Sequence, residues 1–75
     1  MIKYKIDVIK ELSNRGYTQS RLRAEKILPG QTLINLRYGK SITLDTLNKI
    51  CLITRLQPGD IIEVVATDEE KIKYF

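Results

Sequence analysis

Residues 18–40, TQSRLRAEKILPGQTLINLRYGK, contain the pattern that decides the fold. Thr18 is a favourable N-cap, and the residues from Gln19 to Lys26 predict a helix of about two turns. The pair Leu28-Pro29 closes that helix, because proline biases the residue before it toward an extended backbone. Proline also suits the first position of a helix, so a second helix is predicted from about Pro29 to Tyr38. The stretch therefore predicts two short helices joined by a tight turn.

The second of these helices has an apolar side and a polar side. Leu33 and Leu36 are three residues apart and turn toward the core. Gln31, Thr32 and Asn35 fall on the other sides, near the start of the helix. A pair of short helices whose second member exposes polar side chains is the plan of a helix-turn-helix.

Further short elements are predicted on both sides of this helix pair. Residues 1–6 alternate apolar and basic side chains, which is typical of a short strand with one buried face. A helix follows from Asp7 until Gly16 stops it, and another begins after the N-cap Thr43 and ends near Leu56. The predicted core consists of leucines on the inward faces of the helices: Leu22, Leu33, Leu36, Leu44 and Leu47.

The C-terminal part of the chain is less regular. Its predicted elements are a turn at Gln57-Pro58-Gly59, one helical turn at residues 60–62, a strand at 63–66 that pairs with residues 2–5, and a flexible tail at 67–75. Residues 1–75 are thus predicted to form a single, mainly α domain of four to five short helices with a small two-stranded sheet from the N- and C-terminal segments.

The charges are unevenly distributed along the chain, whose formal net charge is +4. Residues 1–58 hold eleven Lys and Arg against four Asp and Glu, a net charge of +7. Residues 59–75 hold two Lys against five Asp and Glu, a net charge of −3. The basic body suits a polyanionic partner.

The composition excludes several classes of site. The chain has one cysteine, Cys51, and no histidine, which excludes internal disulfides, cysteine-rich zinc sites and histidine acid/base catalysis. Cys51 lies among apolar residues and is expected to be a buried thiol. No paired-carboxylate or Ser/Lys constellation is present, so we expect no enzyme activity, no cofactor, no metal and no small-molecule ligand. No stretch is long and apolar enough for a membrane span or a signal peptide, and we expect a cytoplasmic protein without a membrane partner.

The helix pair resembles the phage repressor and Cro family, also called XRE-type. The matching residues are Thr18, Gln19, Leu22, Thr32, Leu33, Leu36, Gly39 and Lys40. The likeness extends over residues 6–62. It implies a sequence-specific transcriptional regulator that binds double-stranded DNA, places the helix from about Pro29 to Tyr38 in the major groove, and acts as a homodimer on two half-sites.

The chain departs from the family pattern in the first helix and the turn. The family usually has Ala where this chain has Arg23, and Gly in the turn where it has Ile27. An arginine cannot be buried unpaired and a β-branched residue resists positive φ, so we expect a different helix crossing or turn. Pro29 and Gly30 replace the Ser-polar pair that commonly opens the recognition helix. Because Gly30 offers no side chain to a base, base specificity is shifted onto its neighbours.

By this resemblance, the candidate base-contacting residues are Gln31, Thr32 and Asn35, and the candidate phosphate-contacting residues are Gln19, Arg21, Arg37, Tyr38, Lys40 and Ser41. Amide side chains can bond adenine at N6 and N7 together. Thr32 could instead reach a phosphate or a thymine methyl, or lie on the helix surface. Arg23 could extend the phosphate-contacting patch. The alternative for all of these residues is an ordinary solvated polar face.

Two features leave a second interpretation open. Ile34 is apolar at a position expected to be exposed, where it could meet thymine methyls or a protein neighbour. Together with the acidic tail, it favours a protein-interaction module such as an antitoxin or a phage-type inhibitor, since a fold does not fix a function. The residues expected to form the dimer surface are Ile61, Ile62, Val64 and Val65.

Overall fold

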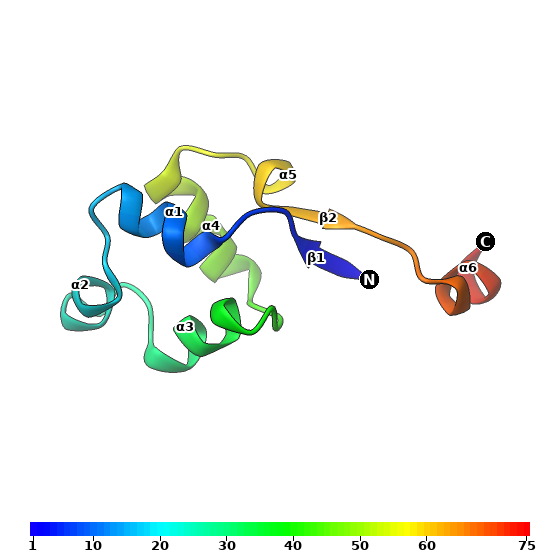
Figure 1. The fold of residues 1–75 in the computed structure, drawn as a ribbon, viewed down its shortest axis with the longest axis horizontal. Coiled ribbons are helices and arrows are strands. Elements are labelled where there is room, and N and C mark those ends of the chain that lie inside the picture. Colours follow the sequence, from blue (N-terminus) through cyan, green and yellow to red (C-terminus); the bar gives the residue numbers. More distant parts are fainter.

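The computed structural model describes all residues 1–75 and has a helical body with a small sheet on one side (Figure 1). Its elements are β1 (Ile2–Tyr4), α1 (Val8–Asn14), α2 (Gln19–Ala24), α3 (Gly30–Arg37), α4 (Leu44–Thr54), α5 (Pro58–Ile61), β2 (Ile62–Val64) and α6 (Asp68–Tyr74). Helix α1 packs against α3 and α4. The predicted mainly α fold with a two-stranded sheet is confirmed.

Side-chain caps fix where three helices of the body begin. Asp7, Thr18 and Thr43 each accept a hydrogen bond from the backbone N–H three residues further on, at 3.1–3.2 Å. These bonds satisfy N–H groups that the helix itself leaves without a partner. The predicted starts of α1, α2 and α4 are confirmed.

The core consists of nine buried side chains from α1 to α5 and the turn between α2 and α3: Val8, Leu12, Leu22, Leu28, Leu33, Leu36, Leu47, Ile50 and Ile61. Four of the five predicted core leucines belong to it. The prediction for Leu44 is wrong, because its side chain is 81% exposed. Leu44 is the first residue of α4, and helical side chains lean toward the N-terminus, so it projects beyond the end of the core.

The two strands pair antiparallel, as predicted, with Ile2 opposite Val64 and Tyr4 opposite Ile62. The second strand begins one residue earlier than predicted. The preceding helix α5 starts at Pro58, where only a turn was predicted, because proline suits the first helical turn and Asp60 accepts from the Gln57 N–H at 2.9 Å.

The residues expected to form a dimer surface are not all available for one. Ile61 is fully buried in the core of its own chain, and Ile62 packs against that core. Val64 and Val65 remain exposed. The sequence could not separate these neighbours, because a helix ends and a strand begins between Ile61 and Ile62.

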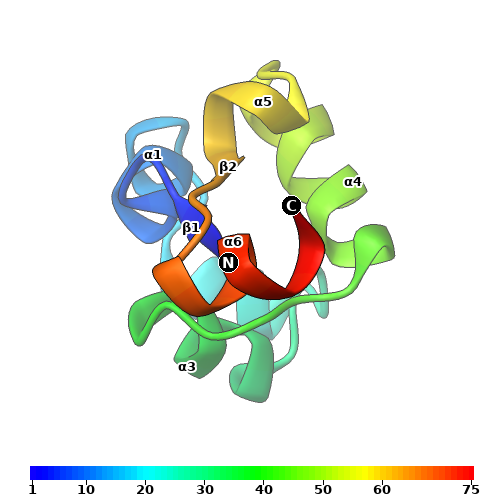
Figure 2. The same cartoon turned by 90° about the vertical axis from the view of Figure 1, so that its right-hand side faces the viewer.

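The C-terminal arm, Val65–Phe75, extends away from the body and makes the molecule 45 Å long against 23 and 19 Å in the other directions (Figure 1). Seen along the long axis, α6 lies in front of the sheet (Figure 2). A flexible tail was predicted over residues 67–75. The structure describes a helix there, and the flexibility of the segment stays a prediction.

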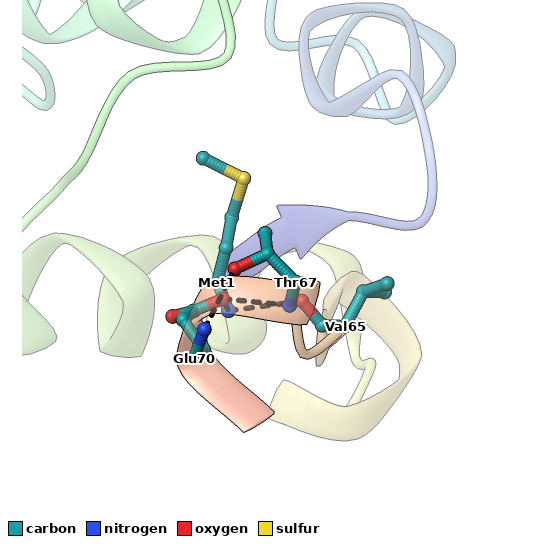
Figure 3. A network of polar contacts seen from close by, with 4 residues as sticks. All are labelled: Met1, Val65, Thr67 and Glu70. Atoms are coloured by element: carbon teal, nitrogen blue, oxygen red, sulfur yellow. Dashed lines mark hydrogen bonds and ion pairs between the residues drawn. The ribbon is translucent and has the colours of Figure 1, made fainter. Parts of the chain in front are cut away.

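Polar contacts at the base of the arm define the start of α6 (Figure 3). Thr67 Oγ1 accepts from the Glu70 N–H at 3.2 Å, and Glu70 Oε1 accepts from the Thr67 N–H at 2.9 Å, which is a capping box. The Met1 ammonium donates to Glu70 Oε1 at 2.5 Å and to the Val65 carbonyl oxygen at 2.9 Å. The hydrogen bond from the ammonium and that from Thr67 lower the pKa of Glu70 to about 2.

Candidate nucleic-acid interface

Helices α2 and α3 lie together on one side of the body, the lower side in Figure 1. The turn between them is built without glycine at its positive-φ position. Lys26 takes φ 55°, while Ile27 keeps negative φ and packs against the core. Because the positive φ falls on Lys26 and not on its β-branched neighbour Ile27, the expected conflict does not arise. Helix α2 ends at Ala24, two residues before the predicted end, because the chain already turns at Lys26.

Two predicted base-contacting residues are brought together on the first turns of α3. Gln31 Nε2 donates a hydrogen bond at 3.1 Å to Oδ1 of Asn35, four residues further along the helix, and Gln31 is exposed while Asn35 is half-buried. Thr32, the third candidate, is half-buried. Pro29 occupies the N-cap rather than the predicted first helical position, and it has no side-chain group to cap the N–H groups of this turn.

A hydrogen bond joins the start of α2 to the C-terminal end of α3. Arg37 Nη2, on the last turn of α3, donates to Gln19 Oε1, on the first residue of α2, at 2.8 Å. The structure therefore brings together two residues that were predicted as phosphate contacts from positions 18 residues apart.

Arg21, another predicted phosphate contact, is held by its own helix and the preceding loop. Its Nε donates to Glu25 Oε2 at 2.6 Å, and its Nη1 donates to the Gly16 carbonyl oxygen at 3.1 Å. The guanidinium also lies 4.2 Å from the centre of the Tyr17 ring. The hydrogen bond and the charge of Glu25 raise the pKa of Arg21 above its ordinary value. The Arg21 guanidinium thus already contacts three groups within the chain.

The loop after α3 exposes the remaining phosphate candidates, Tyr38, Lys40 and Ser41. Its backbone is fixed at Lys40, whose N–H donates to the Asn35 carbonyl oxygen at 2.7 Å and whose carbonyl oxygen accepts from the Tyr4 hydroxyl at 2.6 Å. Burial raises the pKa of Tyr4, which keeps this hydroxyl protonated as a donor. The sequence pattern gave no sign of this role for Tyr4, because its partner lies 36 residues away.

A comparison with protein-family models matches residues 7–67 to the Cro/C1-type HTH DNA-binding domain. The chain belongs to this family. The match spans α1 to α5 and β2, so it includes the whole helix-turn-helix. Membership makes the chain a DNA-binding regulator with double-stranded DNA as its partner, and it confirms the predicted resemblance. Comparisons with curated proteins and with solved structures find no match.

The charges of this Cro/C1-type domain suit a polyanion on the side of α2 and α3. The molecule contains three ion pairs, which involve Met1 with Glu70, Arg15 with Glu11, and Arg21 with Glu25. The other cations on or next to α2 and α3 have no carboxylate partner: Arg23, Lys26, Arg37 and Lys40. Unpaired cations are available to phosphates without first breaking an ion pair.

Other kinds of site have little support in the domain. No group of three metal-ligating side chains comes together. Cys51 is half-buried on α4 rather than fully buried as expected, and burial raises the pKa of its thiol, which keeps it protonated. No helix combines the length and the apolar character needed to span a membrane.

Proposed function

We propose that this Cro/C1-type domain regulates transcription by inserting α3 into the major groove and reading base edges with Gln31, Thr32 and Asn35. The observation that carries this proposal is the hydrogen-bonded amide pair on α3, of which Gln31 is exposed and Asn35 is half-buried. The pair holds both side chains in one orientation, and each amide keeps a free donor or acceptor group for a base. Adenine presents N6 and N7 to such groups in the major groove.

The phosphate contacts in this proposal surround the amide pair. Gln19 and Arg37 are already joined, and Tyr38, Lys40 and Ser41 follow on the exposed loop. Contacts of this kind set the register of a protein on the duplex without carrying sequence information. Arg21 would have to give up its bonds to Glu25 and Gly16 to reach a phosphate, so we assign it the smallest contribution.

Selection of bound DNA from a random pool by residues 1–75 tests the proposal. We expect a motif that this chain binds well above scrambled DNA, with affinity that falls steeply as salt rises, as counterion release requires. A pool that yields no motif, or binding that is insensitive to salt, would contradict it.

We also propose that the regulator is a homodimer joined through its C-terminal arms. Helix α6 buries none of its side chains, and Ile72 is 85% exposed beside Tyr74 and Phe75. The arm holds Asp68, Glu69 and Glu70 against Lys71 and Lys73, so two arms can approach each other with little net charge on either. In Figure 1 the arm continues from β2 to one side of the body, while α2 and α3 lie on the lower side. Two copies joined through their arms can therefore present both α3 helices to one side of a duplex.

Sedimentation velocity tests the dimer. We expect wild-type chains to sediment as dimers and Ile72→Asp chains as monomers, because a carboxylate cannot be buried unpaired in an apolar contact. Lys71→Gln, which changes the charge of the same helix by the same amount without placing a carboxylate at the apolar position, is the matched control. A wild type that stays monomeric on operator DNA, or an Ile72→Asp variant that remains dimeric, would contradict the proposal.

A protein-interaction module is the second candidate. Its support is Ile34, which is 43% exposed in the middle of α3, where an apolar side chain suits a protein neighbour as well as thymine methyls. An antitoxin or a phage-type inhibitor would be of this kind. A random pool that yields no motif would favour this candidate over the regulator.

A further inference from the structure

Helix α2 carries two arginines that the structure treats differently. Arg21 is bound to Glu25, to the Gly16 carbonyl oxygen and to the Tyr17 ring. Arg23 is exposed, and its guanidinium makes neither a hydrogen bond nor an ion pair within the molecule. The two residues have the same charge and lie two positions apart, so they form a natural comparison.

The stem of Arg23 lies over the first residue of α3. Its Cδ is 3.9 Å from the point where a Cβ on Gly30 would be. The backbone at Gly30 does not require a glycine, because its φ is not positive; the glycines with positive φ are Gly16 and Gly39. A Cβ on Gly30 would make an ordinary contact with the Arg23 stem, so the stem lies beside this part of the α3 surface. Arg23 and Gly30, two of the four residues that depart from the family pattern, are therefore neighbours on the surface.

The position of Arg23 places it at the base-reading end of α3. Gly30 immediately precedes Gln31, whereas Arg37 and Lys40 lie at the other end of the helix and beyond it. In helix-turn-helix proteins the N-terminal residues of the recognition helix meet base edges. A guanidinium presents a planar fork of donors that matches O6 and N7 of guanine.

We propose that Arg23 is a specificity-determining residue that reads a guanine next to the base pair read by Gln31. The proposal rests on the proposed function, because it requires α3 in the major groove. Arg23 then supplies from α2 the base contact that Gly30 cannot make from α3. Arginine is required for this role, since the single ammonium of lysine has the charge but not the fork.

The test compares Arg23→Lys with Arg21→Lys in selections from the same random pool, followed by titrations at two salt concentrations. We expect Arg23→Lys to keep the nonspecific affinity and salt dependence of the wild type. Its preference for guanine at one position should fall by about 5- to 150-fold. Arg21→Lys should keep the wild-type motif. Thermal melting checks that both variants are folded.

A second variant tests the contact itself. Gly30→Leu would occupy the space of the Arg23 stem, and we expect it to relax the same base position, with no further loss when it is combined with Arg23→Lys. An unchanged motif for Arg23→Lys would overturn the proposal. A third variant, Arg23→Ala, would also overturn it if its affinity fell equally for all DNA sequences, because an equal loss indicates a phosphate contact. A wild type without any motif would overturn the proposed function and this inference with it.

Discussion

The helical body and the C-terminal arm of this domain are both mainly helical, but different forces hold them. The body surrounds nine buried apolar side chains. Helix α6 buries none, and it is fixed by its capping box and the Met1 contacts. Short helices are marginal in water without tertiary packing. The apolar core therefore accounts for the stability of the body, whereas polar contacts at its base place the arm.

The largest expected effect comes from the same kind of truncation made in both regions. Leu33→Ala removes a buried side chain from α3 and should lower the free energy of unfolding by about 2–5 kcal/mol. Ile72→Ala removes an exposed one from α6 and should change it by about 0.5 kcal/mol or less in the monomer. Urea denaturation of both variants at low protein concentration measures the difference. Equal losses would show that the arm shares the core, contrary to the comparison.

A smaller effect is expected on the face that the body presents to DNA. Gln31→Ala or Asn35→Ala should cost about 1–3 kcal/mol on the selected operator and relax the preference at one or two base pairs. Binding to scrambled DNA should be nearly unchanged, because amides do not neutralise phosphates. Titrations against operator and scrambled DNA measure the ratio. If both variants keep the full ratio, the amide pair does not read bases.

The cations of the body should separate into binding and scaffold residues. Arg37→Ala should weaken binding to all sequences about equally and reduce the salt slope by about 1, as expected for a phosphate contact. Lys40→Ala should act in the same way. Arg21→Ala is the comparison, and we expect a smaller change because its guanidinium already has internal partners. A loss confined to one operator position in Arg37→Ala would count against the phosphate assignment.

The smallest effect is expected at the base of the arm. Glu70→Gln removes the carboxylate that meets Met1 and should increase amide hydrogen exchange in α6 without changing DNA affinity per half-site. The folded pKa of Glu70 is about 2, below its ordinary value of 4.5. Its contribution is therefore present above pH 4.5 and is lost as the pH falls toward 2. Glu69→Gln makes the same charge change without this contact, and equal exchange in the two variants would be inconsistent with the contact.

Much of the candidate site followed from the sequence because its determinants are local. Gln31 and Asn35 are four residues apart on one helix, so helical geometry alone places them together. The junction of Gln19 with Arg37 was not predicted as a contact, although both residues were candidates. Helix α6 has a local signal as well, the capping box Thr67 with Glu70, which the acidic run beside it obscured.

By itself the sequence determined the starts of α1, α2 and α4, four of the five inward leucines and the helix-turn-helix, because caps and apolar periodicity act over a few residues. Only the tertiary structure decided that Leu44 is exposed, that Ile61 is buried, and that Tyr4 holds the loop at Lys40. It also decided which arginine of α2 is tied down and which lies free over Gly30. These outcomes depend on contacts between separate elements. The residue spacing along one helix does not contain them.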